Sequence, residues 1–571
     1  MKDRVILDIG TTELNKVWDD HDWQLIQKRV KNLRRRIFRA TREKKWNQVR
    51  SLMKLMLRSQ SNLLLAIKRT TQENRGKRTP GIDGRKALTN RKREKLYQEI
   101  REHTPWKVKP TKRIYIPKSN GKTRPLGIPA LRDRVMQAVV KNALEPSWEA
   151  RFEAKSYGFR PGRCTHDAIA QSHARLNSSK LHKWVLEGDI KGAFDNISHK
   201  FILDTIGQIP GRELIKQWLK AGYVENNVYH LTSSGTPQGG IISPLLANIA
   251  LDGMENLLSQ FYKVREYHSS PKAKRQRVTK RKLPKYGFCR YADDFLITAE
   301  TESDLKEILP VIRKWLKERG LELNEEKTKI TPVNTGFNFL GFHIRQYRGK
   351  CITKPQKEKV LNFLQKIRDW LNSHKSVPAL DVINHLNPVL RGWGNYYRHG
   401  ASKRTFSYVD SEIYRAIWKW ACRRHPNKSK KWIVRKYFQT SSEGWKLKYT
   451  TLNRRGDSQP ITLCKVYSIK IDRYIQVKGR NSPDDPDLNE YWENRKTSFG
   501  KKLLAKGSRL HQVANNQNWK CTECKEHLFN GEKLQQHHKI HMKDGGLETV
   551  ENLELIHQSC HMNKHSREKR A

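Results

Sequence analysis

The sequence lacks any apolar run near the roughly 18 residues that a membrane-spanning helix needs. Its first residues also lack the basic-then-apolar pattern of a secretory signal, so we expect no membrane association. Cysteine is scarce, with eight residues in 571, and most of them stand alone. This distribution excludes a secreted disulfide framework and indicates a reduced intracellular protein.

Acidic residues are also in short supply. There are 57 Asp and Glu against 114 Lys and Arg, which gives a formal net charge of +57. The excess is spread over most of the chain, so the folded protein repels itself unless a polyanion is nearby. Nucleic acid is the expected partner, because Lys and Arg bind phosphates strongly. An anionic membrane surface is the alternative.

The chain divides into regions of different pattern, and its length predicts three to five domains. Residues 20–70 have apolar residues at helical spacing, and 107–345 alternate short strands with helices. The region after Lys354 is predicted to be helical, and residues 446–515 are predicted to be mixed, basic and rich in turns. The basic run Pro271–Pro284 is either a mobile surface insertion or a nucleic-acid contact. Asn481–Pro486 is predicted to be a linker.

Three aspartates stand at the ends of predicted strands. Asp293 and Asp294 join the apolar runs Phe288–Tyr291 and Phe295–Thr298, and Asp189 ends another buried strand. Adjacent carboxylates between apolar strands are costly unless a cation neutralises them. Two Mg²⁺ ions about 3.5–4 Å apart do this in phosphoryl transfer. We expect Asp189 and Asp293 to bridge both ions and Asp294 to support them. A plain hairpin tip is the alternative.

The neighbouring motifs argue against a plain hairpin tip. In chain order they are Arg113–Pro129, Gly235–Pro244, Leu321–Thr328 and Phe339–Phe342. Together with the two aspartate strands they resemble the fingers and palm of reverse transcriptases, in the order of that family. The resemblance implies the fold of a right-hand polymerase.

The resemblance also assigns roles around the incoming nucleotide. The residues expected to contact it are Lys118, Arg124, Ile190 and Gln238. Lys118 and Arg124 would hold the triphosphate, and Gln238 would lie beside the sugar. Phe194 would exclude a 2′-hydroxyl, which implies dNTP substrates, unless it is a core aromatic. Lys327 is the candidate general acid for the leaving pyrophosphate, unless it is an exposed helix lysine.

Three further segments narrow the family. Pro80–Gly84 precedes the fingers motif, Ser156–Arg163 follows it, and Asn387–Tyr397 lies in the predicted helical region. With them, nearly the whole chain resembles the group II intron-encoded proteins, which are maturase–reverse transcriptases. The resemblance implies a thumb, or X domain, that binds structured intron RNA and favours its splicing.

The last of these segments suits RNA chemically. Arg391 can meet a phosphate, while Trp393 and Tyr397 can stack on bases. The alternative is that the two rings, four residues apart on a helix, belong to the core.

A Cys/His module ends the sequence. Two tightly spaced ligand pairs, Cys521 with Cys524 and His557 with Cys560, fit tetrahedral structural Zn²⁺. The module is too small to bury much core, so the metal would supply much of its folding free energy.

The histidines around that module resemble an HNH endonuclease. The ligands implied for a divalent cation, expected to be Mg²⁺, are His537, His561 and His565. His538 would be the general base, and Asn552 would orient its loop. A zinc knuckle that only binds DNA is the alternative. Gln535 stands where related proteins often carry Glu.

The predicted fold is therefore multidomain, α/β and α, with fingers and palm, a helical thumb and a small ββα-metal module. The expected domains are 1–74 (RNA-binding helical extension), 75–350 (fingers and palm), 351–445 (thumb), 446–515 (DNA-binding region and linker) and 516–571 (nuclease with zinc site).

The expected function has three parts: reverse transcription with dNTPs, assistance to intron splicing within a ribonucleoprotein, and nicking of target double-stranded DNA. The nick would prime reverse transcription during intron retrohoming. One alternative is an RNA-binding splicing factor with reduced enzymatic activity. The other is a reverse transcriptase with a host function in defence or repair. We expect a bacterial protein, in the cytoplasm or with the nucleoid, and a protein of an organelle is the alternative.

Overall fold

A computed structural model describes residues 18–102, 107–117, 121, 123–177, 182–268, 278–440, 444–452, 458–504 and 507–568. Lys118 and residues 271–277 of the basic run lie outside these described residues. No helix among them is both long enough and apolar enough to cross a bilayer.

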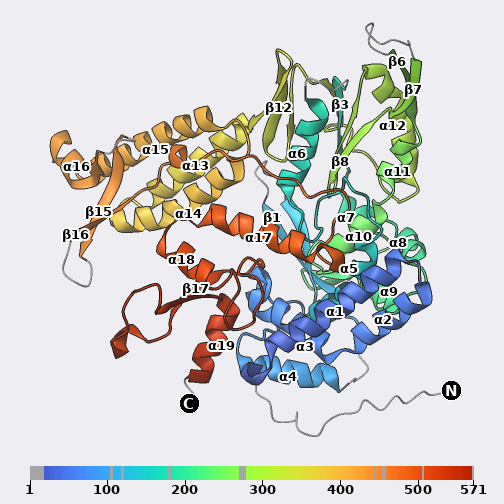
Figure 1. The fold of residues 1–571 in the computed structure, drawn as a ribbon, viewed down its shortest axis with the longest axis horizontal. Helices are drawn as coiled ribbons and strands as arrows, with labels where there is room; N and C mark the ends of the chain where they lie inside the picture. The colour runs from blue at the N-terminus through green and yellow to red at the C-terminus, as the bar shows by residue number, and fades with distance from the viewer. Residues whose placement is uncertain are drawn as a thin grey trace.

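Helices at the N-terminus pack around a central buried helix (Figure 1). They are α1 (Trp23–Arg42), α2 (Trp46–Arg58), α3 (Gln60–Lys68), α4 (Asn90–Arg101) and the central α5 (Leu131–Glu149). The apolar residues of α1 recur every three or four positions, and Trp23, Ile26 and Val30 are buried against the other helices. The predicted helical region is thus confirmed.

The fingers and palm each contain a four-stranded sheet. The fingers sheet has the order β2-β1-β4-β5, with strands β1 (Thr111–Pro117), β2 (Thr123–Ile128), β4 (Tyr223–Glu225) and β5 (Val228–His230). The palm sheet has the order β10-β3-β9-β8, with strands β3 (Trp184–Asp189), β8 (Gly287–Tyr291), β9 (Asp294–Ala299) and β10 (Lys329–Pro332). The α/β pattern predicted for residues 107–345 is confirmed.

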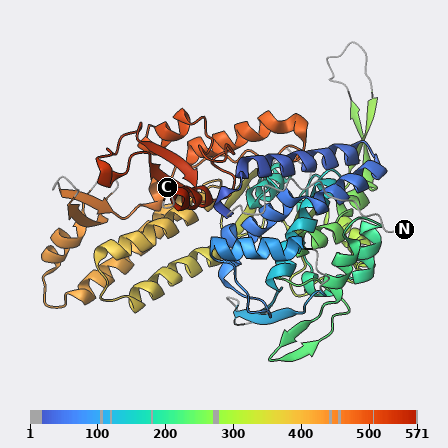
Figure 2. The ribbon, with the colours of Figure 1, turned by 90° about the horizontal axis from the view of Figure 1, so that it is seen from below.

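Three helices pack on the palm sheet: α6 (Thr165–Leu176), α11 (Met254–Ser259) and α12 (Glu302–Lys317). The chain between β3 and β8 also forms α7 (Ala193–Asn196), α8 (His199–Ile206), α9 (Arg212–Lys220) and α10 (Ser243–Ala250). One hydrophobic core joins these elements to the N-terminal helices. The hairpin of β6 (Tyr262–His268) and β7 (Val278–Pro284) projects from the body (Figure 2). The described end of the basic run is therefore an exposed strand.

The thumb follows a small sheet of β11 (Phe337–Phe339), β12 (Phe342–Tyr347) and β13 (Lys350–Pro355). Its helices are α13 (Lys357–Ser373), α14 (Ala379–Tyr397), α15 (Lys403–Arg424) and α16 (Lys430–Tyr437). A second sheet follows, with β14 (Phe438–Gln439), β15 (Lys446–Leu452) and β16 (Ser458–Thr462). The predicted helical region is confirmed for the thumb, and β15 and β16 lie in residues 446–515, for which a mixed, turn-rich pattern is predicted; only β14 falls inside the predicted helical region.

The chain then returns across the molecule toward the N-terminal helices (Figure 1). Residues 472–486, which we call the strap, lead into α17 (Asn489–Leu503) and α18 (Arg509–Asn516). Arg34 of α1 bonds both oxygens of Asp484 at 2.7 and 2.6 Å, and Arg42 lies 2.9 Å from Asp485. Ser482, Asp484 and Asp485 are buried. The predicted linker at Asn481–Pro486 is therefore wrong: ion pairs to α1 fix this segment.

The C-terminal module has its own small core. It contains β17 (Leu534–His538), β18 (Leu553–His557) and α19 (Gln558–Glu568). The two strands are antiparallel, and the module lies beside α3, one of the N-terminal helices (Figure 1).

Candidate active sites

The three predicted aspartates lie together at one end of the palm sheet. Strand β3 pairs with β9 so that Asp189 is directly opposite Asp294. Asp293 occupies the turn between β8 and β9, where Ala292 has a left-handed φ of 59°. The strand–turn–strand that the apolar runs predict is thus confirmed, and it brings the carboxylates of two strands to one place.

The carboxylates perturb one another. Burial raises the pKa of Asp294 to about 7, and the charges of Asp293 and Asp189 add to the effect. Burial and Asp189 also raise the pKa of Asp293. A divalent cation that binds to this crowded, partly buried cluster displaces its protons, because the positive charge removes the repulsion between the carboxylates. The donor set, all carboxylate oxygens, fits Mg²⁺.

Lys327 lies at the edge of this cluster. Its Nζ donates to Asp189 Oδ2 at 2.8 Å, and Asn324 Nδ2 donates to the same oxygen at 3.0 Å. The hydrogen bond to Asp189 raises the pKa of Lys327, so the ammonium carries its proton beside the predicted reaction centre. Lys327 is exposed, as the alternative supposed, but it contacts a predicted metal ligand.

The segment Ser156–Arg163 backs the aspartate turn. At Gly158 an added Cβ would lie 2.3 Å from the Ala292 nitrogen, so only glycine allows this approach. Arg160 fixes the segment by bonding Glu149 through Nε and Nη2, at 3.0 and 2.9 Å. Its Nη1 donates to two backbone carbonyls, and both side chains of the ion pair are 1% exposed.

Of the predicted nucleotide contacts, Arg124 is close enough to Asp293 for its charge to act on that carboxylate, and Lys118 is outside the described residues. Phe194 packs edge-on to Phe159, with ring centroids 6.1 Å apart. Gln238 donates to Asp195 at 3.1 Å, and Arg124 is exposed on β2. Ile190 directly follows Asp189 and is 2% exposed, and its contact with a nucleotide stays a prediction.

The thumb aromatics are part of the core. Trp393 stacks on Phe363 with centroids 4.8 Å apart, and it contacts Tyr397 at the same separation. Tyr397 is only 5% exposed. The prediction that Tyr397 stacks on RNA is therefore wrong, and Trp393 faces other thumb rings. Arg391 is exposed on the same helix and remains available to a phosphate.

The zinc ligands predicted from spacing converge. The donor atoms of Cys521, Cys524, His557 and Cys560 all lie within 4.8 Å of one another, and all four residues are buried. His557 sits between the cysteines, with Nδ1 at 3.3 Å from Cys524 Sγ. Soft donors at these separations fit one tetrahedral Zn²⁺.

A second histidine cluster forms between β17 and α19. His537 is 3% exposed, and neither of its ring nitrogens has a hydrogen-bond partner. His561 and His565 approach it from α19, with their Nε2 atoms 3.1 Å apart. Several imidazoles gathered around the buried His537 ring fit a divalent metal ion.

The sequence reasoning missed two members of this cluster. Donor atoms of His541 and Glu568 lie within 4.8 Å of those of His537 and His565. The predicted ligand His561 is not part of this group of four, although its Nε2 lies 3.1 Å from His565 Nε2. Glu568 follows His565 by three residues on one helix, and its Oε2 is 2.8 Å from His565 Nδ1. That spacing was the available signal for Glu568. His541 lies in a loop, and no periodicity marks it.

The predicted general base lies next to this cluster. His538 follows His537 on β17, so its side chain points to the opposite face of the hairpin. Asn552 bonds the main chain of the following loop, accepting from Ile540 N at 2.8 Å and donating to Leu547 O at 2.7 Å. It thus fixes the loop after His538, and its role in orienting the general base stays a prediction.

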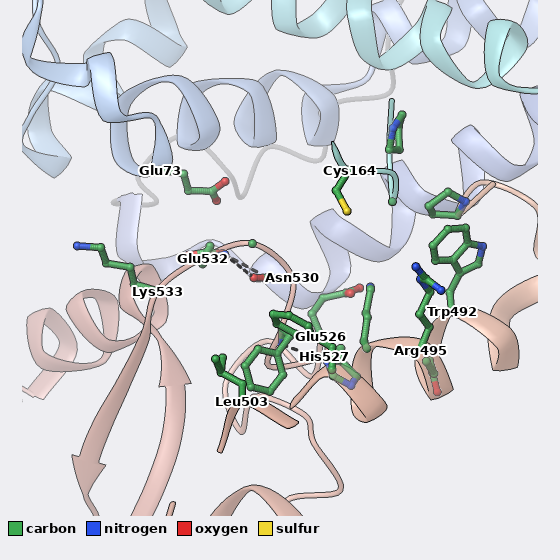
Figure 3. Close-up of a pocket in the computed structure, with 18 of the residues that line it drawn as sticks. Glu73, Cys164, Trp492, Arg495, Leu503, Glu526, His527, Asn530, Glu532 and Lys533 are labelled. Carbon is green, nitrogen blue, oxygen red and sulfur yellow. Dashed lines mark hydrogen bonds between the residues drawn. The ribbon is translucent and has the colours of Figure 1, made fainter. Parts of the chain in front are cut away.

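A cavity of about 1970 Å³ lies where the N-terminal helices, thumb, strap and nuclease module meet (Figure 3). Trp492 and Arg495 of α17 line one part of it, and the loop from Glu526 to Lys533 lines another. Across this junction Lys31 pairs with Glu526 at 3.6 Å, and the buried Lys68 lies 3.9 Å from Glu532. The nuclease module therefore docks on the helices at the start of the chain.

Four family models match the chain in succession. Residues 18–100 match the N-terminal domain of reverse transcriptase, and 116–344 match reverse transcriptase (RNA-dependent DNA polymerase). Residues 360–438 match the group II intron maturase-specific domain, and 521–567 match HNH endonuclease.

Individual relatives agree with these matches. Protein YkfC of Escherichia coli is 35% identical over 54% of this chain and 88% of its own. The group II intron-encoded protein LtrA of Lactococcus lactis is 30% identical over 66% of this chain and 75% of its own. A telomerase structure from Candida tropicalis matches 43% of this chain and 55% of its own at 15% identity. Its TM-score of 0.30 is too low to support an argument. On the sequence matches, the chain belongs to the group II intron-encoded proteins, as a maturase–reverse transcriptase that carries a C-terminal HNH endonuclease.

Proposed function

We propose that this multifunctional intron protein carries out target-primed reverse transcription. It binds its intron RNA, assists splicing, and brings the excised RNA to double-stranded target DNA. After the RNA inserts into one DNA strand, the HNH module nicks the other. The freed 3′-hydroxyl then primes cDNA synthesis from dNTPs at the palm.

The meeting of Asp189, Asp293 and Asp294 at one end of the sheet carries this proposal. Mg²⁺ ions bound there would activate the 3′-hydroxyl and stabilise the leaving pyrophosphate. Asp189 and Asp293 are the proposed shared ligands, and Asp294 supports them. Their raised pKa values support the same assignment, because a metal-free cluster of this kind holds protons that a cation displaces.

The chain's own side chains would do the remaining work in the palm. Arg124 and Lys118 hold the triphosphate, and Gln238 contacts the sugar. The Phe194 ring fills the space that a 2′-hydroxyl would need. Lys327 keeps its proton beside Asp189 and would pass it to the pyrophosphate.

In the nuclease, we assign His537, His561 and His565 as ligands of a divalent cation, for which Mg²⁺ is the proposed ion. His538 takes the proton of the attacking water, and Asn552 keeps the His538 loop in place. Zn²⁺ held by the Cys521 cluster would stabilise the module.

RNA binding is assigned to residues 1–74 and 351–445, the latter through exposed cations such as Arg391. Residues 446–515 are assigned to target DNA, since α17 lines the cavity beside the nuclease. The fingers and palm are taken as 75–350 and the nuclease as 516–571. Binding to target DNA would place the ribonucleoprotein at the bacterial nucleoid.

Asp293→Ala tests the polymerase assignment. The variant should lose cDNA synthesis on a primed RNA template, because the shared ligand is gone. It should retain intron binding and splicing at low Mg²⁺, since neither uses this carboxylate. Retained cDNA synthesis would contradict the assignment, and loss of all three activities would show that the domains are not separable.

His538→Ala tests the nuclease assignment on a labelled target duplex. Nicking should disappear while zinc content and cDNA synthesis on a pre-nicked target stay as in the wild type. Nicking by both proteins would show that His538 is not the base.

A further inference from the structure

Glu554 is a buried carboxylate that the proposed nuclease chemistry does not use. It lies on β18 directly opposite His537 and is 5% exposed. Thr522 Oγ1 donates to its Oε2 at 2.6 Å, and Lys564 Nζ donates to its Oε1 at 2.5 Å. His537 Nδ1 lies 3.1 Å from the same Oε1.

The three neighbours of Glu554 come from three different parts of the module. Thr522 lies inside the Cys521–Cys524 pair that belongs to the zinc cluster. Lys564 is on α19, between His561 and His565. His537 is the ligand proposed on β17. One carboxylate therefore joins the zinc cluster to both elements that would hold the nuclease metal.

The charge of Glu554 is maintained by its partners. Thr522 and Lys564 each donate a hydrogen bond to one of its two oxygens, and these bonds stabilise the ionised carboxylate. An ionised carboxylate beside Nδ1 of an imidazole favours the tautomer that carries its proton there. The Nε2 lone pair is then free for a metal ion.

His537 fits this role. Its Nδ1 lies at ion-pair distance from Glu554, and its Nε2 lies 3.7 Å from Glu568 Oε1, but neither contact is a hydrogen bond. A buried imidazole with two unsatisfied nitrogens is costly unless a ligand binds one of them. The ring lies among His541, His561 and His565, at centroid separations of 5.1–5.9 Å.

We propose that Glu554 is a positioning residue of the nuclease, which directs His537 Nε2 to the metal and ties that ligand to the zinc cluster. This inference rests on the metal site assigned in the proposed function. It also accounts for Gln535, which stands on β17 where related proteins often carry Glu. In this chain the carboxylate beside His537 comes from Glu554 on β18 instead.

The test is Mn²⁺ binding to the full-length protein, measured by electron paramagnetic resonance. An Asp189→Ala/Asp293→Ala background removes the polymerase site, so the signal reports the nuclease. In this background Glu554→Gln should bind Mn²⁺ about 10- to 100-fold more weakly, as for other residues that orient metal ligands. The electron spin echo modulation from Mn²⁺-bound imidazole should lose the contribution of one histidine, and zinc should stay at one ion per chain.

Glu523→Gln is the matched control. Glu523 also pairs with Lys564, at 3.8 Å, and lies between the same two cysteines, but no contact joins it to His537. It should bind Mn²⁺ as tightly as the parent. Mn²⁺ binding unchanged by Glu554→Gln would overturn the inference, and so would loss of zinc in that variant, which would show a structural role only.

A second pair of variants separates this inference from the assigned metal site. His537→Ala and His565→Ala should each abolish Mn²⁺ binding in the same background. If they do not, the metal site itself is wrongly assigned. If they do and Glu554→Gln has no effect, only the positioning role fails.

Discussion

Replacing Asp294 by Asn is expected to stabilise the metal-free protein while abolishing DNA synthesis. Burial and two neighbouring carboxylates raise the pKa of Asp294 to about 7, far above its ordinary value. The folded state therefore binds this proton more tightly than the unfolded state. The contribution of this proton to the free energy of unfolding is complete at pH values below the pKa that Asp294 has in the unfolded chain. The contribution falls as the pH rises toward the pKa of Asp294 in the folded protein, and above that pKa no more is lost.

The size of the effect follows from that window. Between about pH 5.5 and pH 7 the wild type loses about 1.4 kcal/mol per pH unit, or about 2 kcal/mol in all. Asn has no proton to lose, so the advantage of Asp294→Asn should grow by that amount between about pH 5.5 and pH 8. Chemical denaturation in EDTA, followed by a palm-specific probe, measures it.

Magnesium supplies the control. Millimolar Mg²⁺ should stabilise the wild type at about pH 8 and should have less effect on the variant, because the cation neutralises the same cluster. An advantage of equal size at both pH values would refute the reasoning, since it would not come from ionisation. A variant less stable than the wild type at both pH values would do the same.

Other substitutions test other parts of the molecule. Phe194→Ala should reduce discrimination against rNTPs by about 10- to 200-fold in primer extension. Unchanged discrimination would show that this ring is only a core aromatic. Arg160→Met leaves the Glu149 charge buried and unpaired; it should cost about 3–5 kcal/mol in denaturant, part of which Glu149→Gln should restore. Arg34→Met should expose the strap to limited proteolysis, whereas the exposed Arg36→Met should not; equal cleavage would show that the ion pairs do not hold it. Chelation of zinc should abolish nicking and spare cDNA synthesis.

Local pattern was sufficient wherever function rests on short-range structure. The aspartate turn follows from two apolar strands that flank Asp293 and Asp294, and the zinc ligands follow from two tight pairs. Spacing could not distinguish a stacking ring from a core ring at Trp393, because both uses place aromatics four residues apart on a helix.

Long-range contacts were invisible to the sequence. Asp484 lies in a stretch rich in proline and aspartate, which has the composition of a linker, and only its contact with Arg34 shows otherwise. A loop whose path the sequence does not predict brings His541 to the nuclease cluster. Glu554 lies beside His537 only because of the register between β17 and β18.

The ion pair between Arg34 and Asp484 also bears on how the protein is made. The two residues are 450 positions apart, so at about 5–20 residues per second a ribosome needs roughly 20 to 90 s to supply the second after the first. During that interval α1 has left the ribosome but Asp484 has not yet been synthesised. The interval between Lys68, in the same domain, and its partner Glu532 is longer still. The N-terminal helices thus spend most of translation with basic side chains uncovered, a period in which nascent protein and newly transcribed RNA can meet before the fold is complete.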